Sequence, residues 1–153
     1  MRLIVAVVGK PKHESLGAAI RDYEERARRY WPLQVIEVKD EPVRGANVEL
    51  AKQREGERLA AAVGSARIVA CEVGGRCMAS GEFADWVQRL REAATDVAFV
   101  IGGAYGLAED VSRRAVARVS FSSWTLPHEL ARLVLAEQLY RAGTILRGEP
   151  YHK

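Results

Sequence analysis

The chain has 153 residues, of which 48% are hydrophobic and 28% are charged, and its formal net charge is +3. This composition is typical of a soluble globular protein, and a chain of this length can bury a core without disulfides or metal. We therefore expect a single domain over residues 1–153. The mild positive charge permits a polyanionic partner without requiring one.

The amino-terminal segment and the two cysteines indicate a cytoplasmic protein. The apolar run 3–8 is too short to cross a membrane, and the charged stretch 10–14 follows it where a signal peptide would be cleaved. Cys71 and Cys77 lack the Cys-x-x-Cys spacing of a zinc site or a redox pair. We expect buried or half-buried thiols and no membrane contact.

Short apolar runs alternate with longer segments whose apolar residues recur at helical spacing. In chain order, strands are predicted at 2–8, 33–38, 68–73, 97–101 and 118–121, and helices at 16–30, 47–63, 80–90, 109–117 and 127–146. Such alternation is typical of a parallel sheet between layers of helices. The sequence therefore predicts an α/β fold with a mainly parallel sheet and helices on both faces.

The last predicted helix, 127–146, is apolar around nearly its whole circumference. A helix of this kind needs more than one packing partner, so we expect it to pack on the sheet and against a second copy of the chain in a homodimer. The alternative is a deeply buried central helix in a monomer. Within this helix, Glu137 and Arg141 have the spacing of a helical ion pair, although both could instead face a ligand.

Three predicted strands end in loops that parallel pairing would bring to one edge of the sheet. These loops cover residues 71–75, 101–106 and 121–127. The first two contain the glycine pairs Gly74-Gly75 and Gly102-Gly103. Such glycines either give clearance to a ligand or form tight turns at positive φ. Together the loops could enclose a small adenine-containing ligand.

The third loop, 121–127, is rich in hydroxyl groups. Ser122, Ser123 and Thr125 could bond to a ligand, and Trp124 offers a flat apolar surface. The alternative is that the hydroxyl groups cap the following helix, with Thr125 at the N-cap.

Common cofactor and metal motifs do not occur in the sequence. The P-loop pattern is missing, and the stretch 8–11 lacks the dinucleotide-binding fingerprint that would follow the first strand. His13, His128 and His152 are widely separated, so we predict no metal site.

Four separated motifs follow one another in the second half of the chain: IGGAYGL at 101–107, FSSWTLPH at 121–128, LAEQLYRA at 135–142 and RGEPYH at 147–152. In this order they resemble the RlmH family of SPOUT-class ribosomal RNA methyltransferases. The resemblance implies an α/β-knot fold with a trefoil knot at the carboxyl end, which residue patterns alone do not predict. It also implies a homodimer that uses S-adenosyl-L-methionine to methylate N3 of a pseudouridine in the 23S ribosomal RNA of the ribosome.

The resemblance also assigns cofactor-binding residues. The family's cofactor contacts fall on the three strand-end loops, at Cys71, Gly102, Gly103, Phe121, Ser122, Ser123, Trp124, Thr125 and Leu126. Relatives commonly carry leucine at the position of Cys71, and Trp124 is bulky for its loop. We expect the backbone contacts to survive both differences, and we expect Gly102 to leave space that the ligand needs.

Methylation of an imide nitrogen requires alignment of the reactants and loss of the nitrogen's proton. We assign Arg141 to stabilise the resulting anion, His152 to accept the proton or hydrogen-bond the base, and Tyr151 to stack on it. The alternative for 151–153 is a frayed chain terminus. We expect the tail of one subunit to lie near the cofactor of the other.

Two other functions fit the same fold. One is an RNA-binding or ribosome-binding module that keeps the SPOUT fold without catalysis, and the other is a SPOUT methyltransferase that acts on transfer RNA. The intact glycine loop and the 121–127 loop argue against the first function. The short chain and its tail motif argue against the second.

Overall fold

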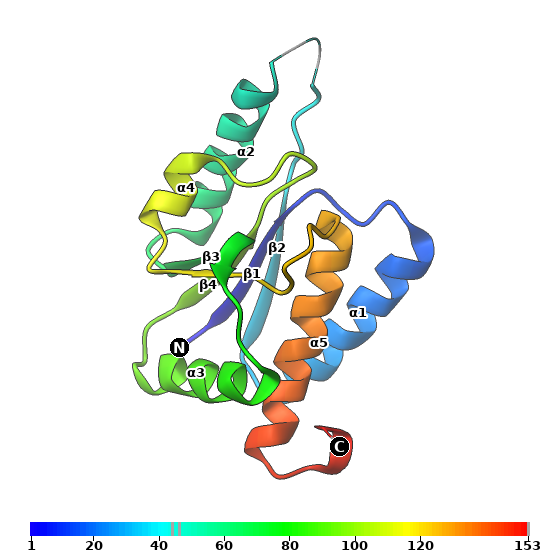
Figure 1. The fold of residues 1–153 in the computed structure, drawn as a ribbon, viewed down its shortest axis with the longest axis vertical. Helices are drawn as coiled ribbons and strands as arrows, with labels where there is room; N and C mark the ends of the chain where they lie inside the picture. The colour runs from blue at the N-terminus through cyan, green and yellow to red at the C-terminus, as the bar shows by residue number, and fades with distance from the viewer. Residues whose placement is uncertain (44, 46, 153) are drawn as a thin grey trace.

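The computed structural model describes residues 1–43, 45 and 47–152 (Figure 1). The strands are β1 (Leu3–Val8), β2 (Leu33–Val38), β3 (Arg67–Arg76), β4 (Val97–Ile101) and β5 (Ala117–Val119). The helices are α1 (Glu14–Arg28), α2 (Val48–Val63), α3 (Ser80–Glu92), α4 (Glu109–Arg114) and α5 (His128–Leu146), with a short 3-10 helix η1 (Pro150–His152) at the end. The strands pair in parallel in the order β2-β1-β4-β3-β5.

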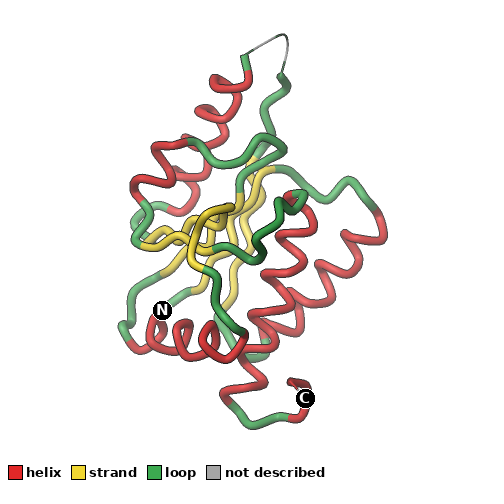
Figure 2. The backbone as a smooth tube through the Cα atoms, in the orientation of Figure 1, coloured by secondary structure: helices red, strands yellow, loops and turns green. Residues whose placement is uncertain are grey.

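Alternate residues of the central strands face two separate apolar cores. On one face Val5 and Phe99 pack with α1, α3 and α5, and on the other Ala6 and Val100 pack with α2 and α4. Figure 2 shows the helices on both sides of the strands. Burial on both faces explains why β1 and β4 are apolar at every position. The predicted α/β fold, a parallel sheet with helices on both faces, is confirmed.

The long helix α5 lies between α1 and α3 on one face of the sheet (Figure 1). Trp31 donates its indole N–H to the carbonyl of Leu139 at 2.8 Å. The buried Arg132 bonds to Glu24 of α1 at 2.7 Å and to Glu37 of β2 at 2.8 Å. Leu135, Leu139 and Ala142 of α5 are buried in the core on this face of the sheet, which accounts for part of its apolar circumference. The packing of α5 on a second copy of the chain stays a prediction.

Strand order and helix packing do not by themselves establish a knot, so the trefoil knot implied by the resemblance also stays a prediction. Among the helices of the described residues, none is long and apolar enough to span a membrane.

The third strand differs from its predicted bounds. Instead of ending before the glycine pair 74–75, β3 runs through it to Arg76 with an irregular register. A Cβ atom on Gly75 would lie 2.6 Å from backbone atoms of Val119, so this glycine allows β3 to approach β5 closely. The fifth strand and the helix before it are shorter than predicted. The prediction that Gly74-Gly75 terminates the strand is therefore wrong.

The contact between α5 and Tyr30, which follows α1, gives a first test of the packing. A Cβ atom on Gly143 would lie 2.2 Å from the ring of Tyr30, so Gly143→Ala should lower the free energy of unfolding by about 1–3 kcal/mol through overpacking. Gly81 in α3 is the matched control, because a Cβ atom there meets nothing within 4 Å. Urea titration should show Gly81→Ala unchanged or slightly stabilised. Equal stability of the two variants would contradict the close helix contact.

Candidate functional site

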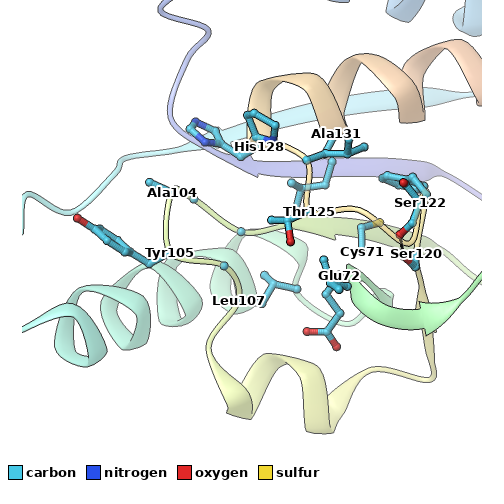
Figure 3. Close-up of a pocket in the computed structure, with 18 of the residues that line it drawn as sticks. Cys71, Glu72, Ala104, Tyr105, Leu107, Ser120, Ser122, Thr125, His128 and Ala131 are labelled. Atoms are coloured by element: carbon cyan, nitrogen blue, oxygen red, sulfur yellow. Dashed lines mark hydrogen bonds between the residues drawn. The ribbon is translucent and has the colours of Figure 1, made fainter.

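The carboxyl ends of β3, β4 and β5 lie side by side because these strands are neighbours in the parallel sheet. A cavity of about 760 Å³ is surrounded by residues 71–73 of β3, by the segments that follow β4 and β5, by the first turn of α5 and by one side chain of α2 (Figure 3). Cavities of this size hold small ligands and cofactors. The predicted meeting of the three segments is confirmed, although the first of them, 71–75, belongs to β3 and is not a loop after the strand.

The cavity collects most of the residues that the resemblance assigned to cofactor binding. Eight of the nine line it: Cys71, Gly102, Gly103, Phe121, Ser122, Trp124, Thr125 and Leu126. The ninth, Ser123, is exposed and is not among the lining residues. In Figure 3, Thr125 lies near the centre of the view, with Cys71 and Ser122 to one side and Tyr105 to the other. The part of these residues in binding stays a prediction.

The glycine loop after β4 is shaped by its own backbone. The N–H of Gly106 donates to the carbonyl of Gly103 at 3.0 Å, and Gly106 has a φ of 86°. A Cβ atom on Gly102 would lie 2.4 Å from the carbonyl carbon of Gly106. The expectation that Gly102 gives clearance to a ligand is therefore wrong, because the loop's own turn fills that space. The positive φ of this loop lies at Gly106 and not at the predicted pair.

The hydroxyl-rich loop after β5 is held by its own side chains. The hydroxyl of Ser120 donates to the carbonyl of Ser122 at 2.6 Å, and the hydroxyl of Ser122 accepts the N–H of Trp124 at 2.9 Å. The predicted N-cap at Thr125 is wrong, since Pro127 occupies the N-cap of α5 and provides no side-chain bond. Thr125 is exposed and lines the cavity instead.

Three ionisable side chains that line the cavity were missed by the sequence analysis: Lys52, Glu72 and His128. The carboxylate of Glu72 accepts bonds from the hydroxyl of Ser112 at 2.8 Å and from Nε of Arg118 at 2.5 Å. Glu72 and His128 adjoin predicted site residues in the sequence, so their position was a usable signal. Lys52 comes from α2, and no local pattern connects that helix with the loops.

The lining suits a small molecule that combines a flat apolar part with polar groups. Ile101, Leu107 and Leu126 contribute apolar surface, and Lys52 and Glu72 contribute side chains of opposite charge. In the part of the chain that the structure describes, no group of three or more His, Cys, Asp or Glu side chains could hold a metal ion.

The residues assigned to catalysis lie near the other end of α5. Arg141 pairs with Glu137 at 2.8 Å, which confirms the predicted helical ion pair. The guanidinium of Arg141 also lies 4.9 Å from the ring centre of Tyr151, whose hydroxyl donates to Glu137 at 3.1 Å. The rise of a helix places Arg141 roughly 20 Å along α5 from His128 at the cavity. Within one chain, therefore, Arg141 and Tyr151 do not meet the cavity.

The surroundings of these two side chains fix their protonation. The hydrogen bond to Glu137 holds the pKa of Arg141 above its usual value, and burial raises the pKa of Tyr151. Both side chains therefore keep their protons at neutral pH. The frayed-terminus alternative is wrong for Tyr151, whose ring lies 4.6 Å from that of Tyr140. His152 is exposed, and Lys153 lies outside the described residues.

The two cysteines differ in a way that thiol chemistry can measure. Cys71 is buried in the cavity wall and burial raises its pKa, whereas Cys77 is exposed. At about pH 8 a thiol reagent should modify Cys77 in the native protein and Cys71 only after unfolding, because the thiolate is the reactive form. In a Cys77→Ser variant the fast native reaction should disappear. A fast reaction that persists in this variant would show that Cys71 is accessible.

Known sequences match this chain along almost its whole length. A family model described as "Predicted SPOUT methyltransferase" matches residues 1–152. The chain is 58% identical over 154 residues to the ribosomal RNA large subunit methyltransferase H of Gemmatimonas aurantiaca, and the match covers 100% of both chains. It is 48% identical to the protein of that name from Sorangium cellulosum, with 99% of each chain covered.

Solved structures of low sequence identity share the fold. A probable methylase family protein from Haemophilus influenzae Rd KW20 superimposes with a TM-score of 0.60 at 13% identity, over 99% of this chain and 70% of that one. A probable methyltransferase from Bordetella pertussis Tohama I gives a TM-score of 0.58 at 15% identity, over 92% and 95%. The family model and the relatives match the chain over its full length, and the parallel sheet with a cavity at its edge agrees with them. The chain therefore belongs to the SPOUT methyltransferase family.

Proposed function

We propose that this methyltransferase uses S-adenosyl-L-methionine to methylate N3 of a pseudouridine in the 23S ribosomal RNA of the ribosome, in the cytoplasm. The observation that carries this proposal is the 58% identity, over the full length, to a protein named ribosomal RNA large subunit methyltransferase H. The cavity supports it, because the residues that the RlmH resemblance assigns to the cofactor gather there with one exception.

The cavity residues fit the proposed cofactor by size and chemistry. Leu107 and Leu126 offer apolar surface to an adenine ring, and Ser122 and Thr125 offer hydroxyl groups to its polar parts. Glu72 supplies a negative charge beside a ligand whose sulfonium and ammonium groups are cationic. When bound, the cofactor supplies a methyl group that its sulfonium makes electrophilic. The protein's own task is then to hold and align the target base.

The remaining chemical requirement is to stabilise an imide nitrogen that has lost its proton. The residues near the carboxyl end, Arg141, Tyr151 and His152, fit this requirement. The guanidinium of Arg141 is charged at neutral pH and is held in place by its bond to Glu137, so it can stabilise an anion. Tyr151 keeps its proton, which its hydroxyl donates to Glu137, and its ring can stack on the base. His152, exposed at the end of η1, is the one of the three assigned residues that remains as a proton acceptor.

A homodimer follows from the distance between these two groups of residues. The cavity lies at the start of α5 and Arg141 lies roughly 20 Å along the same helix, so one chain cannot apply both to one base. A second copy that lays its tail over the cavity would complete the site. We therefore include a homodimer with shared sites in the proposal.

Transfer of labelled methyl groups tests the substrate class. The purified protein is incubated with labelled S-adenosyl-L-methionine and, separately, with assembled ribosomes, free ribosomal RNA and transfer RNA, the ribosomes coming from cells that lack this methylation. We expect label in the large-subunit RNA, where digestion and mass spectrometry should identify a pseudouridine methylated at N3.

Thr125→Trp provides the control for this assay, because a bulky side chain at an exposed position of the cavity should block transfer without disturbing the core. Label in transfer RNA alone would make the protein a transfer RNA methyltransferase. Cofactor binding without transfer to any of the three RNAs would favour a binding module. Either outcome would contradict the proposed function.

A further inference from the structure

Exposed apolar surface is concentrated at the mouth of the cavity. Among the described residues the exposed large hydrophobic side chains are Leu50, Val73, Tyr105, Val116, Trp124 and Leu146. Three of these six, Val73, Tyr105 and Trp124, line the cavity, the first from β3 and the other two from the loops after β4 and β5. Trp124 is 79% exposed and Tyr105 is 52% exposed. Exposed apolar residues gathered at one place mark an interaction site.

Both aromatic side chains project from loops of defined shape. The loop of Trp124 is held by the bond between its own N–H and the hydroxyl of Ser122. The loop of Tyr105 is closed by the bond from Gly106 to Gly103. In Figure 3 Tyr105 projects at one edge of the view, and Ser122 lies on the opposite side. The two aromatic side chains therefore reach the cavity from two different loops. Because both loops are held by their own hydrogen bonds, little loop ordering is needed before they bind.

The chemistry around the two exposed rings favours RNA as their partner over the surface of the second subunit, whose tail the proposed dimer brings to the same cavity. Lys52 and Glu72 line the same cavity, and Arg118 beside Glu72 has a side chain that is 54% exposed. The centre of an interface between protein copies is depleted of such charges. Exposed aromatic rings next to cations are instead typical of surfaces that bind unpaired nucleotides, because every base has a face that stacks.

We propose that Trp124 and Tyr105 are stacking platforms for unpaired bases of the RNA substrate at the cavity mouth. This inference rests on the proposed function. A base inside a helix must leave its stack before an enzyme can act on it, and stacking on an aromatic ring returns part of that energy. The backbone of the 121–127 loop is then free to contact the cofactor inside the cavity while the indole of Trp124 faces the RNA.

The test separates RNA binding from cofactor binding. Trp124→Ala should raise the KM for the ribosomal substrate by about 5- to 100-fold, the loss expected for one base–aromatic stack. Trp124→Phe should recover most of this loss because it keeps a ring. Tyr105→Ala should show a smaller effect in the same direction. For all three variants, the dissociation constant for S-adenosyl-L-methionine by calorimetry and the sedimentation coefficient should stay at the wild-type values.

Val116→Ala is the matched control, because Val116 is also 51% exposed but does not line the cavity. Its KM should equal that of the wild type. If Trp124→Ala raised the cofactor dissociation constant as much as it raised the KM for the ribosomal substrate, the indole would belong to the cofactor site. If the variant sedimented as a lighter species, the indole would lie between two copies of the chain. Either result, or an unchanged KM, would overturn the stacking role. Failure of the wild-type protein to methylate any RNA would instead reject the proposed function.

Discussion

Parallel pairing of β3 with β4 on one side and β5 on the other is the constraint on which the candidate site depends. Because the three strands are adjacent and run in the same direction, residues 71–73 of β3 and the segments that follow β4 and β5 meet at one edge and surround one cavity. Gly75 lets β3 approach the backbone of β5, and Gly102 lets the loop after β4 fold back on itself. These two glycines therefore serve the packing of main chain on main chain beside the cavity.

The helix α5 connects the cavity with the carboxyl-terminal tail. Its first turn lines the cavity, and Arg141 near its other end pairs with Glu137 and contacts Tyr151. Between these points the buried Arg132 bonds to Glu24 and Glu37, so the two carboxylates compensate its charge in the interior. A helix held in this way fixes the distance between cavity and tail, and that distance is why the account requires a second subunit.

Local sequence patterns were sufficient to predict most of the fold. Each strand of the central pair is a short apolar run, as in 97–101, and the helices repeat their apolar residues at helical spacing. The position of the cavity was predictable because parallel strands end at the same edge of the sheet. The role of Gly75 was not predictable, since the close approach of β5 is a tertiary contact. Lys52 was missed for the same reason, because α2 reaches the loops only in the folded chain. The knot rests on the resemblance alone, whereas the homodimer was also predicted from the apolar circumference of 127–146.

The central claim is that a complete site takes its cavity from one subunit and its tail from the other. It is tested most directly with a purified heterodimer of one Thr125→Trp subunit, whose cavity is filled, and one Arg141→Gln subunit, whose tail has lost its cation. Each parent homodimer should transfer almost no methyl groups to ribosomal RNA. The heterodimer should regain transfer, because one of its two sites combines an intact cavity with an intact tail. A heterodimer as inactive as both parents would contradict the account, since each subunit would then need its own tail.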